Sequence, residues 1–214
     1  MIELFQITGS ASFAARAALE ELDIPYRTVD IHPRLRGDPP EFAAVNPLRR
    51  VPALRDGAVT VYETAAVLAY LGDRYREPVL APAIDAPERG AYLRWLVWLS
   101  NTLHSVWYPI ERAVGPEQRT AALLRLDDVG AYLERELAGR EWCVGDRFSL
   151  VDVYLYMLTG WQHYSEPLRL GGVGVAAHYH RVGARPAIAR TRVLDDLDER
   201  LQRHHPELRA GRPV

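Results

Sequence analysis

The chain carries N-P-L-R-R-V-P-A-L at residues 46–54, followed by Y-E-T at residues 62–64. The Val-Pro pair opens a short strand, an Asp-Gly pair marks a hairpin turn, and the Glu-Thr pair stands where the next helix begins. This combination predicts a peptide-binding site. A strand edge offers main-chain hydrogen bonds, an acid pairs with an amine, and helix N–H groups hold a carboxylate. A small peptide with both termini free would use all three.

Hydrophobic periodicity on either side of this stretch predicts an α/β domain in the first third of the chain. The expected strands cover residues 2–7, 26–31, 52–55 and 58–61, and the expected helices cover 13–22, 41–45 and 63–75. The N-cap of the first helix is expected at Ser10 or Ser12. The order β-α-β-α-β-β-α is that of the thioredoxin-like fold. The first two strands should be parallel because a helix joins them, so the sheet should be mixed.

The rest of the chain shows only helical patterns. Proline punctuates residues 76–87, which indicates a linker. The expected helices cover residues 88–114, 116–138, 150–164, 175–183 and 186–203. The sequence therefore predicts a thioredoxin-like domain at 1–76, a linker at 77–87, an all-α helical domain at 88–203 and a tail at 204–214.

Composition excludes several classes of function. The net charge is -2 and the pI about 6.4, which argues against nucleic acid or an anionic membrane as a partner. All 26 basic residues are arginine, so no lysine Schiff base can form. No apolar run is long enough to span a bilayer, and no signal peptide is evident. The single cysteine, Cys143, fits a reducing cytosol and a cytoplasmic protein, and is expected to be a small buried hydrophobe.

A helix-capping pattern precedes the expected helix at 150–164. The Ser149 hydroxyl can accept the Asp152 N–H while the Asp152 carboxylate accepts the Ser149 N–H. Phe148 and Val153 occupy the positions of the accompanying hydrophobic contact. We interpret Asp152 as a folding device without a catalytic role.

Taken together, these features resemble the cytosolic glutathione transferases over nearly the full chain. The resemblance rests on the thioredoxin-like order, the 46–54 run, Glu63-Thr64, the proline-rich linker and the Ser149–Asp152 cap. Within this family the chain is most similar to the bacterial beta class, on the residues F5…G9-S-A-S12 and N101-T-L-H104. One departure matters. The class pattern has a cysteine where this chain has Ala11, so a mixed disulfide at that position is unavailable.

The resemblance implies that glutathione is the co-substrate. Glu63 would pair with its ammonium group, and the Thr64 hydroxyl with the helix N–H groups would hold the γ-glutamyl carboxylate. Val51-Pro52 is expected to be cis, with the Val51 main chain pairing with the cysteinyl part. Arg34 and Arg50 are two candidates for binding the glycyl carboxylate.

Activation of the thiol needs a hydrogen-bond donor near the sulfur, because the neutral thiol is a poor nucleophile. Ser12 at the first turn of a helix fits this role best, with Ser10 as the fallback and the other hydroxyl serving as the cap. The resemblance adds His104 as a second candidate. The expected electrophile pocket consists of four aromatic residues: Trp107, Tyr108, Trp161 and Tyr164.

Two further patterns are not interpreted as sites. Residues 171–174 are glycine-rich but follow a helix, whereas a phosphate-binding loop follows a strand. His178-x-His180 and His204-His205 lack companion ligands at metal spacing, so no metal is predicted.

The predicted function is a glutathione transferase that activates the thiolate for attack on a small hydrophobic electrophile. Two alternatives remain open. One is a glutathione-dependent isomerase or lyase. The other is a non-catalytic glutathione-binding or interaction module, a reading that Ala11 favours and the otherwise intact site opposes. The family resemblance also implies a homodimer.

Overall fold

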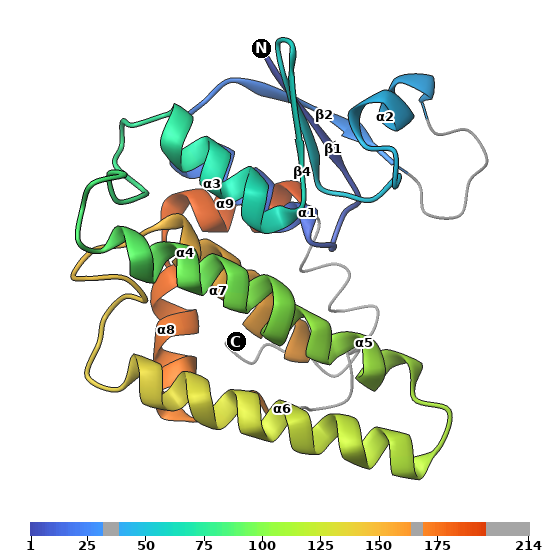
Figure 1. Ribbon diagram of the computed structural model, residues 1–214, viewed down its shortest axis with the longest axis vertical. Helices are drawn as coiled ribbons and strands as arrows, with labels where there is room; N and C mark the ends of the chain where they lie inside the picture. Colours follow the sequence, from blue (N-terminus) through green and yellow to red (C-terminus); the bar gives the residue numbers. More distant parts are fainter. Residues whose placement is uncertain (32–38, 164–168, 196–214) are drawn as a thin grey trace.

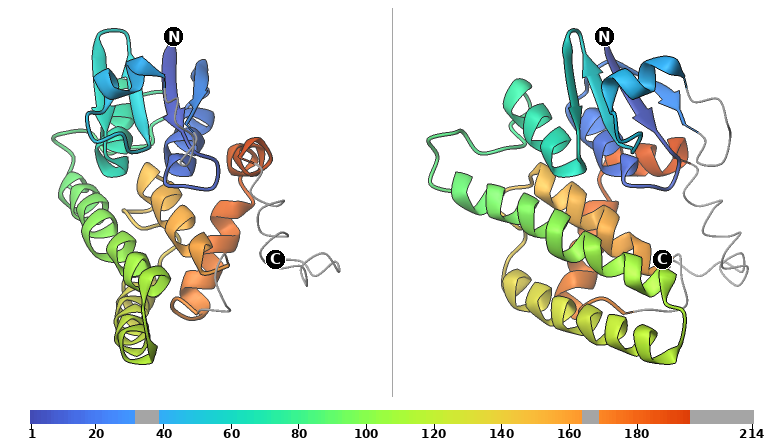
Figure 2. Two further views of the ribbon diagram at one scale, coloured as in Figure 1. Left: turned by 90° about the vertical axis from the view of Figure 1, so that its right-hand side faces the viewer. Right: turned by 45° about the vertical axis from the view of Figure 1, so that its right-hand side comes forward.

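The computed structural model describes residues 1–31, 39–163 and 169–195. A sheet with its flanking helices forms one part of the molecule, and a layer of long helices lies against it (Figure 1). The arrangement is clearest from the side, where helices α4 to α8 gather on one side of the sheet-containing part (Figure 2). This is the thioredoxin-like domain followed by an all-helical domain that the sequence predicted. The boundaries at residues 77 and 87 stay predictions.

The sheet has four strands in the order β2-β1-β3-β4. These strands are β1 (Ile2–Gln6), β2 (Tyr26–Asp30), β3 (Ala53–Asp56) and β4 (Val59–Tyr62). β1 and β2 are parallel, and β1–β3 and β3–β4 are antiparallel, which confirms the mixed sheet. β1 is central, and all five of its residues are buried.

Helices cover both faces of this sheet. One face packs against α1 (Ser12–Glu21) and α3 (Thr64–Arg74), with Ile2, Leu4 and Leu54 pointing into that core. The other face carries Phe5, whose ring stacks on Phe42 of α2 (Pro40–Val45) at 5.5 Å between centroids. The alternation of buried residues along β1 therefore divides the core into two layers.

The helical domain is built around α7 (Leu150–Gly160), which is buried from Leu150 to Thr159. The other elements are α4 (Arg89–Trp98), η1 (Leu99–Leu103), α5 (His104–Arg112), α6 (Pro116–Leu137), η2 (Trp161–His163), α8 (Val173–Gly183) and α9 (Pro186–Leu194). α9 packs against α1, so the last described helix returns to the first domain (Figure 1). No helix of the described residues is long and apolar enough to cross a membrane.

Several predicted helix limits were wrong. The helix expected over 88–114 is interrupted at Leu99–Leu103 by a π-helical turn. The helix expected over 150–164 ends at Gly160 and continues as the 3-10 turn η2. α8 begins two residues earlier than predicted, at Val173. Of the helix expected over 186–203, the described part ends at Leu194.

The capping pattern at the start of α7 is confirmed. The Ser149 N–H donates to Asp152 Oδ2 at 2.8 Å, and the reciprocal bond to the Ser149 side chain is also present. The carboxylate does more than the sequence predicted, because Oδ1 also accepts the Cys143 N–H at 2.9 Å and lies 2.9 Å from His178 Nε2. Asp152 thus joins the preceding loop and α8 to α7.

The glycine-rich run before α8 has a structural partner. Glu134 on α6 accepts the N–H groups of Gly172, Gly174 and Val175 at 2.5 to 3.1 Å. Its carboxylate occupies the helix N-terminus that an anion would otherwise use. This explains why the run is not a phosphate-binding loop.

Candidate functional site

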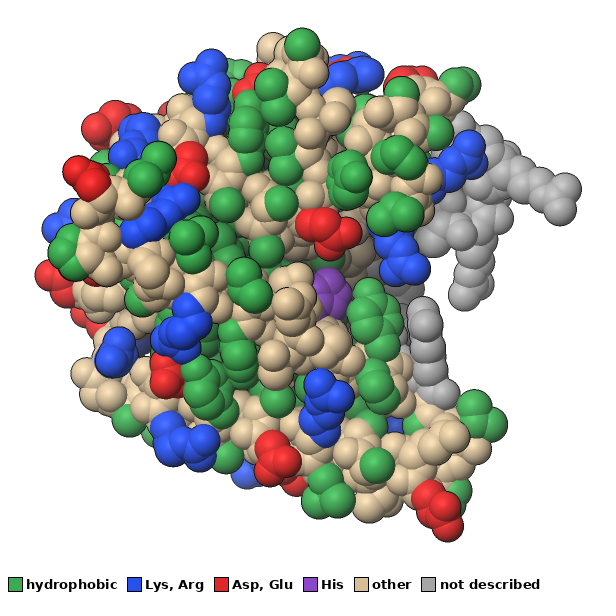
Figure 3. All heavy atoms as spheres, in the orientation of Figure 1, with side chains coloured by type: hydrophobic (Ala, Val, Ile, Leu, Met, Phe, Trp, Pro, Cys, Tyr) green, Lys and Arg blue, Asp and Glu red, His purple; other side chains and the backbone are tan. Residues whose placement is uncertain are grey.

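A cleft of about 660 Å³ lies between the two domains. On the face shown in Figure 3, a hollow contains a histidine surrounded by hydrophobic, acidic and basic side chains. Nine residues predicted for the site line this cleft: Ser10, Arg50, Val51, Pro52, Glu63, Thr64, His104, Tyr108 and Trp161. The structure therefore brings together residues from the first domain and from two elements of the second, α5 and η2.

The loop before β3 forms one wall. Its Val51-Pro52 peptide bond is cis, as predicted. Asn46, which is buried, shapes the loop: its side-chain amide donates to the Arg50 carbonyl at 2.8 Å and its Oδ1 accepts the Leu48 N–H at 3.0 Å. Arg50 is exposed at the edge of the cleft.

The start of α3 forms the next part of the wall. Thr64 is its first residue and is buried, and Glu63 precedes it in a left-handed conformation with φ 71°. Non-glycine residues in that region are uncommon and concentrate at functional sites. The Glu63 side chain is exposed and makes no hydrogen bond or ion pair to another described residue. An exposed carboxylate, unpaired among the described residues, therefore lies beside the helix N-terminus.

Ser12, the residue predicted to activate the thiol, does not line the cleft. Its side chain is 0% exposed, and its Oγ accepts the Ile7 N–H at 3.3 Å. Ser10 does line the cleft, and its Oγ accepts the Ser12 N–H at 3.1 Å, which supports the start of α1. The fallback residue is thus the serine that a ligand could reach.

Ala11, at the class cysteine position, lies between these two serines and lines the cleft. Its N–H makes no hydrogen bond to another described residue and is available as a donor at the first turn of α1. The Ser10 hydroxyl, in contrast, donates to the Ile7 carbonyl at 2.6 Å. The loop before it is fixed from the other domain, because the Gly9 N–H donates to Asp195 Oδ2 at 2.7 Å.

The π-helical turn brings a polar face of the helical domain to the cleft. Ser100, His104 and Tyr108 all line it. A π-turn widens the helix and leaves carbonyl groups to be satisfied. The Ser105 hydroxyl meets this need, since it lies 2.8 Å from the Asn101 carbonyl and 2.9 Å from the Thr102 carbonyl. π-turns are frequent at functional sites.

His104 is the titratable group at the centre of this face. Its Nδ1 lies 3.2 Å from the Tyr154 hydroxyl. Burial lowers the pKa of His104 to about 4, so the imidazole is neutral at pH 7. A neutral imidazole has one donor and one acceptor nitrogen. His104 can therefore donate to a ligand or accept from it, but it carries no positive charge.

Aromatic rings surround His104. Tyr108 stacks on it at 5.7 Å with an interplanar angle of 11°, and Trp161 meets it edge-on at 4.9 Å. These two predicted pocket residues line the cleft. Trp107 does not, because it is 2% exposed and packed in the core. Tyr164 and Arg34, predicted for the electrophile pocket and the glycyl carboxylate, lie outside the described residues.

Sequence reasoning missed Tyr154, Ser100 and Asn46. Tyr154 lies in a helix that is apolar throughout, so no periodicity separated it from core residues. Burial raises the pKa of Tyr154 despite the nearby Ser100 and Thr64 hydroxyls, which favour its ionised form. The polar Ser-Asn-Thr stretch at 100–102 was the available signal for Ser100.

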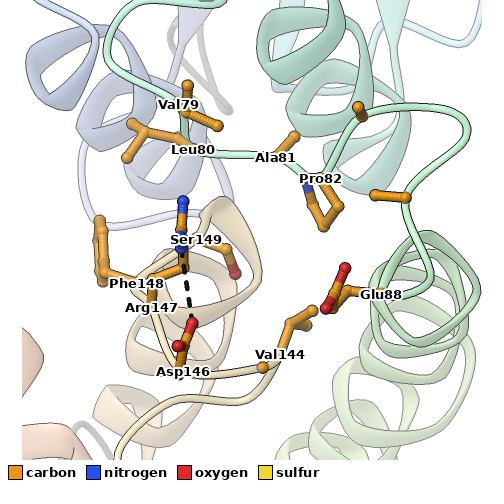
Figure 4. Close-up of a pocket in the computed structure, with 13 residues that line it drawn as sticks. Val79, Leu80, Ala81, Pro82, Glu88, Val144, Asp146, Arg147, Phe148 and Ser149 are labelled. Carbon is orange, nitrogen blue, oxygen red and sulfur yellow. Dashed lines mark ion pairs between the residues drawn. The ribbon is translucent and has the colours of Figure 1, made fainter.

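A second cavity, of about 340 Å³, lies between the linker and the loop before α7 (Figure 4). Residues 79–82 form one wall and residues 144–149 the other. The Leu150 N–H donates to the Leu80 carbonyl at 2.9 Å, which ties the two walls together. Its ion pair, Asp146–Arg147, has side chains that are 94% and 77% exposed. The cavity lacks the converging buried polar groups of a ligand site among the described residues.

Cys143, Asp152 and His178 form a buried cluster whose ligand-type atoms lie within 4.8 Å of one another. Burial raises the pKa of the Cys143 thiol well above its usual value, so the thiol keeps its proton. The Asp152 oxygens already accept the Cys143 and Ser149 N–H groups. We therefore interpret the cluster as support for α7.

The comparisons with known proteins agree with this geometry. Residues 4–79 match the model of the glutathione S-transferase N-terminal domain, and residues 101–172 match that of the C-terminal domain. The chain is 28% identical over 192 residues to glutathione S-transferase GstA of Escherichia coli O157:H7, covering 87% of this chain and 95% of that protein.

Solved structures give the same result. A sphingomonad glutathione S-transferase complexed with glutathione is 30% identical, with a TM-score of 0.80 over 91% of this chain and 99% of that chain. The beta class enzyme of Sphingomonas chungbukensis is 27% identical, with a TM-score of 0.79 over the same shares. Together with the cis-proline loop and the helix start at Thr64, these matches show that the chain belongs to the glutathione S-transferase family.

Proposed function

We propose that the cleft binds glutathione and activates its thiol for attack on a small hydrophobic electrophile. The observation that carries the proposal is the arrangement of the cleft. Glu63 and Thr64 form an anchor for a zwitterionic end at the start of α3, while Ser10 lines the same cleft just before α1 and His104 lines it from α5. The family membership and a relative solved in complex with glutathione support the ligand.

The γ-glutamyl end is assigned to the start of α3. The free carboxylate of Glu63 pairs with the ammonium group, and the N–H groups of the first turn hold the carboxylate with the help of the Thr64 hydroxyl. The Val51 main chain beside the cis proline pairs with the cysteinyl residue. Arg50 is proposed for the glycyl carboxylate, and Arg34 remains a second proposal for that contact.

The thiol is then placed near the first turn of α1. The Ala11 N–H and the positive end of the helix dipole favour the thiolate over the thiol. The Ser10 hydroxyl adds a donor when it turns from the Ile7 carbonyl to the sulfur. His104 adds a donor from the second domain. None of these groups takes the thiol proton permanently, so the proton passes to water. With Ser12 buried, thiol activation is assigned to Ser10 and His104.

The electrophile is placed against Tyr108 and Trp161. Their rings offer apolar surface beside the sulfur position. The thiolate donates its electron pair to a carbon that bears a leaving group, the C–S bond forms, and the leaving group departs with its bonding pair. A chloro-nitro-arene is a suitable probe for this chemistry.

A dimer and a cytoplasmic location complete the proposal. Leu93 and Val97, one turn apart on α4, are 43% and 56% exposed, which supports an interface with a second copy. The one cysteine of the chain supports a reducing compartment.

The test combines binding and turnover. Titration calorimetry with glutathione should give a saturable heat, and the chloro-nitro-arene should be conjugated at a rate that rises with enzyme concentration. Binding without turnover of any electrophile or isomerisable substrate would favour the non-catalytic module. Absence of binding would overturn the proposal.

A further inference from the structure

Tyr154 reaches the cleft from a helix that is otherwise core. It is 0% exposed, and its ring meets the His104 ring edge-on at 85°, with 6.5 Å between centroids. Its hydroxyl lies 3.2 Å from Nδ1 of His104. A buried hydroxyl in the interior of an apolar helix needs a hydrogen-bond partner, because an unpaired one destabilises the fold.

The direction of the bond between these two groups follows from their chemistry. Burial raises the pKa of Tyr154, so its oxygen keeps one proton at pH 7. A phenol hydroxyl is a better hydrogen-bond donor than acceptor, whereas the unprotonated nitrogen of a neutral imidazole is a strong acceptor. The favoured bond therefore runs from the Tyr154 O–H to His104 Nδ1, at 3.2 Å.

The tautomer of His104 is then fixed. Its imidazole is neutral and has a single N–H. If Nδ1 accepts from Tyr154, the proton is on Nε2, at the other side of the ring. Nε2 makes no hydrogen bond to another described residue, and His104 lines the cleft. The N–H is therefore available to a bound ligand.

We propose that Tyr154 is a positioning residue that holds His104 in the Nε2–H tautomer, so that the ring donates a hydrogen bond to the glutathione thiolate. The inference rests on the proposed function and assigns a role within the same site. His104 acts as a donor and keeps its proton throughout, while the thiol proton leaves to water. A histidine in the other tautomer would present a lone pair to the thiolate and repel it.

The tautomer can be measured directly. Wild-type protein with ¹⁵N-labelled histidine is examined at pH 7 by long-range ¹H–¹⁵N correlation, and His104 is assigned as the signal that His104→Gln removes. We expect the pattern of a protonated Nε2 and a bare Nδ1. Tyr154→Phe should convert it to a mixture of tautomers. A protonated Nδ1 in the wild-type protein would overturn the proposal, whether or not any variant folds.

The same variants are tested for thiol activation. Tyr154→Phe should raise the apparent thiol pKa of bound glutathione and lower kcat by about tenfold, with a smaller change in glutathione affinity. The matched control is Tyr156→Phe, which removes a hydroxyl from a buried tyrosine on the same helix outside the cleft. It should leave the tautomer unchanged and kcat within about twofold.

Failure of the inference is distinct from failure of the proposed function. If the wild-type protein binds and conjugates glutathione but Tyr154→Phe changes neither the tautomer nor the thiol pKa, the role of Tyr154 is wrong and the function stands. If the wild-type protein neither binds nor conjugates glutathione, the function fails, and the role of Tyr154 toward its thiolate fails with it.

Discussion

Glu63 holds a left-handed backbone conformation at the start of α3, with φ 71°, which costs a non-glycine residue of order 1–3 kcal/mol. Glu63 keeps this conformation at a position where its exposed carboxylate lies beside the N-terminus of α3. This residue was identified from the sequence because an acid and a hydroxyl before an apolar helix form a local pattern. Ser12 could not be placed in the same way. Two serines two positions apart are equivalent in sequence, and only packing decides which one is buried.

Glu63→Gln tests the anchor. The amide cannot pair with an ammonium ion, so glutathione affinity should fall by about 10- to 100-fold, corresponding to the 1.5–3 kcal/mol of a charge-assisted hydrogen bond. Calorimetric titration measures the glutathione affinity of the variant and of the wild type. Asp146→Asn is the matched control, since its side chain is 94% exposed at the second cavity, and it should bind like the wild type. Equal affinities for Glu63→Gln and the wild type would contradict the assignment.

His104 predicts a pH dependence of stability. Its pKa is about 4 in the folded state, below the value of 6.5 in an unfolded chain. Between these values the unfolded chain binds more protons, so the free energy of unfolding falls as pH falls from about 6.5 through 4. Urea denaturation across this range should show a shallower pH slope for His104→Gln than for the wild type, by up to about 3 kcal/mol over the whole window. Identical slopes would refute the lowered pKa.

Among the elements, the π-turn at Leu99–Leu103 was the least accessible to prediction. Apolar residues recur at helical spacing on both sides of it, so one continuous helix over 88–114 was the natural interpretation. One wider turn barely changes that pattern, but it changes which side chains face the cleft. The start of α7 was predicted because a capping box is local. The contacts of Tyr154 could not be predicted, because they depend on where α7 packs against η1.

Glu134 predicts a second stability effect, at the start of α8. Three backbone N–H groups lower the pKa of its carboxyl against the opposing effect of burial. Glu134→Gln should lower the free energy of unfolding by about 1–2 kcal/mol at pH 7. Because the folded pKa is depressed, this contribution is present above the ordinary glutamate pKa and is lost as pH falls through the folded value. The difference between variant and wild type should therefore shrink in acid.

The control for this helix is Glu117→Gln. Glu117 lies in the first turn of α6 and is exposed, so its loss should cost only a few tenths of a kcal/mol. Chemical denaturation at pH 7 and in acid compares the three proteins. If Glu134→Gln lowers the free energy of unfolding no more than Glu117→Gln does, the Glu134 carboxylate does not cap α8.

At the scale of the whole molecule, the two domains share one core and several buried links. Arg185 of the second domain pairs with Glu21 of α1 at 2.7 Å, and Asp195 accepts the Gly9 N–H. The fold class and element order followed from the sequence because each element carries its own periodicity. The links between the domains could not be predicted from the sequence, because they join residues more than 160 positions apart.

These links predict cooperative unfolding. Asp195→Ala leaves the Gly9 N–H without its acceptor, so the protein should lose about 1–3 kcal/mol of stability and still unfold in a single transition. Circular dichroism and tryptophan fluorescence should give the same midpoint, because Trp95 and Trp107 report on the helical domain. Two separate transitions in the wild type would contradict a shared core.

Ultraviolet titration of the thiolate in the complex is the decisive test of whether this cleft binds glutathione and activates its thiol. We expect the thiol pKa of bound glutathione to lie at least about one unit below the value near 8.5 of a free thiol. Ser10→Ala and His104→Gln should each shift this pKa part of the way back toward 8.5. A bound thiol that titrates near 8.5 in the wild type, or whose pKa both variants leave unchanged, would show that the cleft does not activate the thiol in this way.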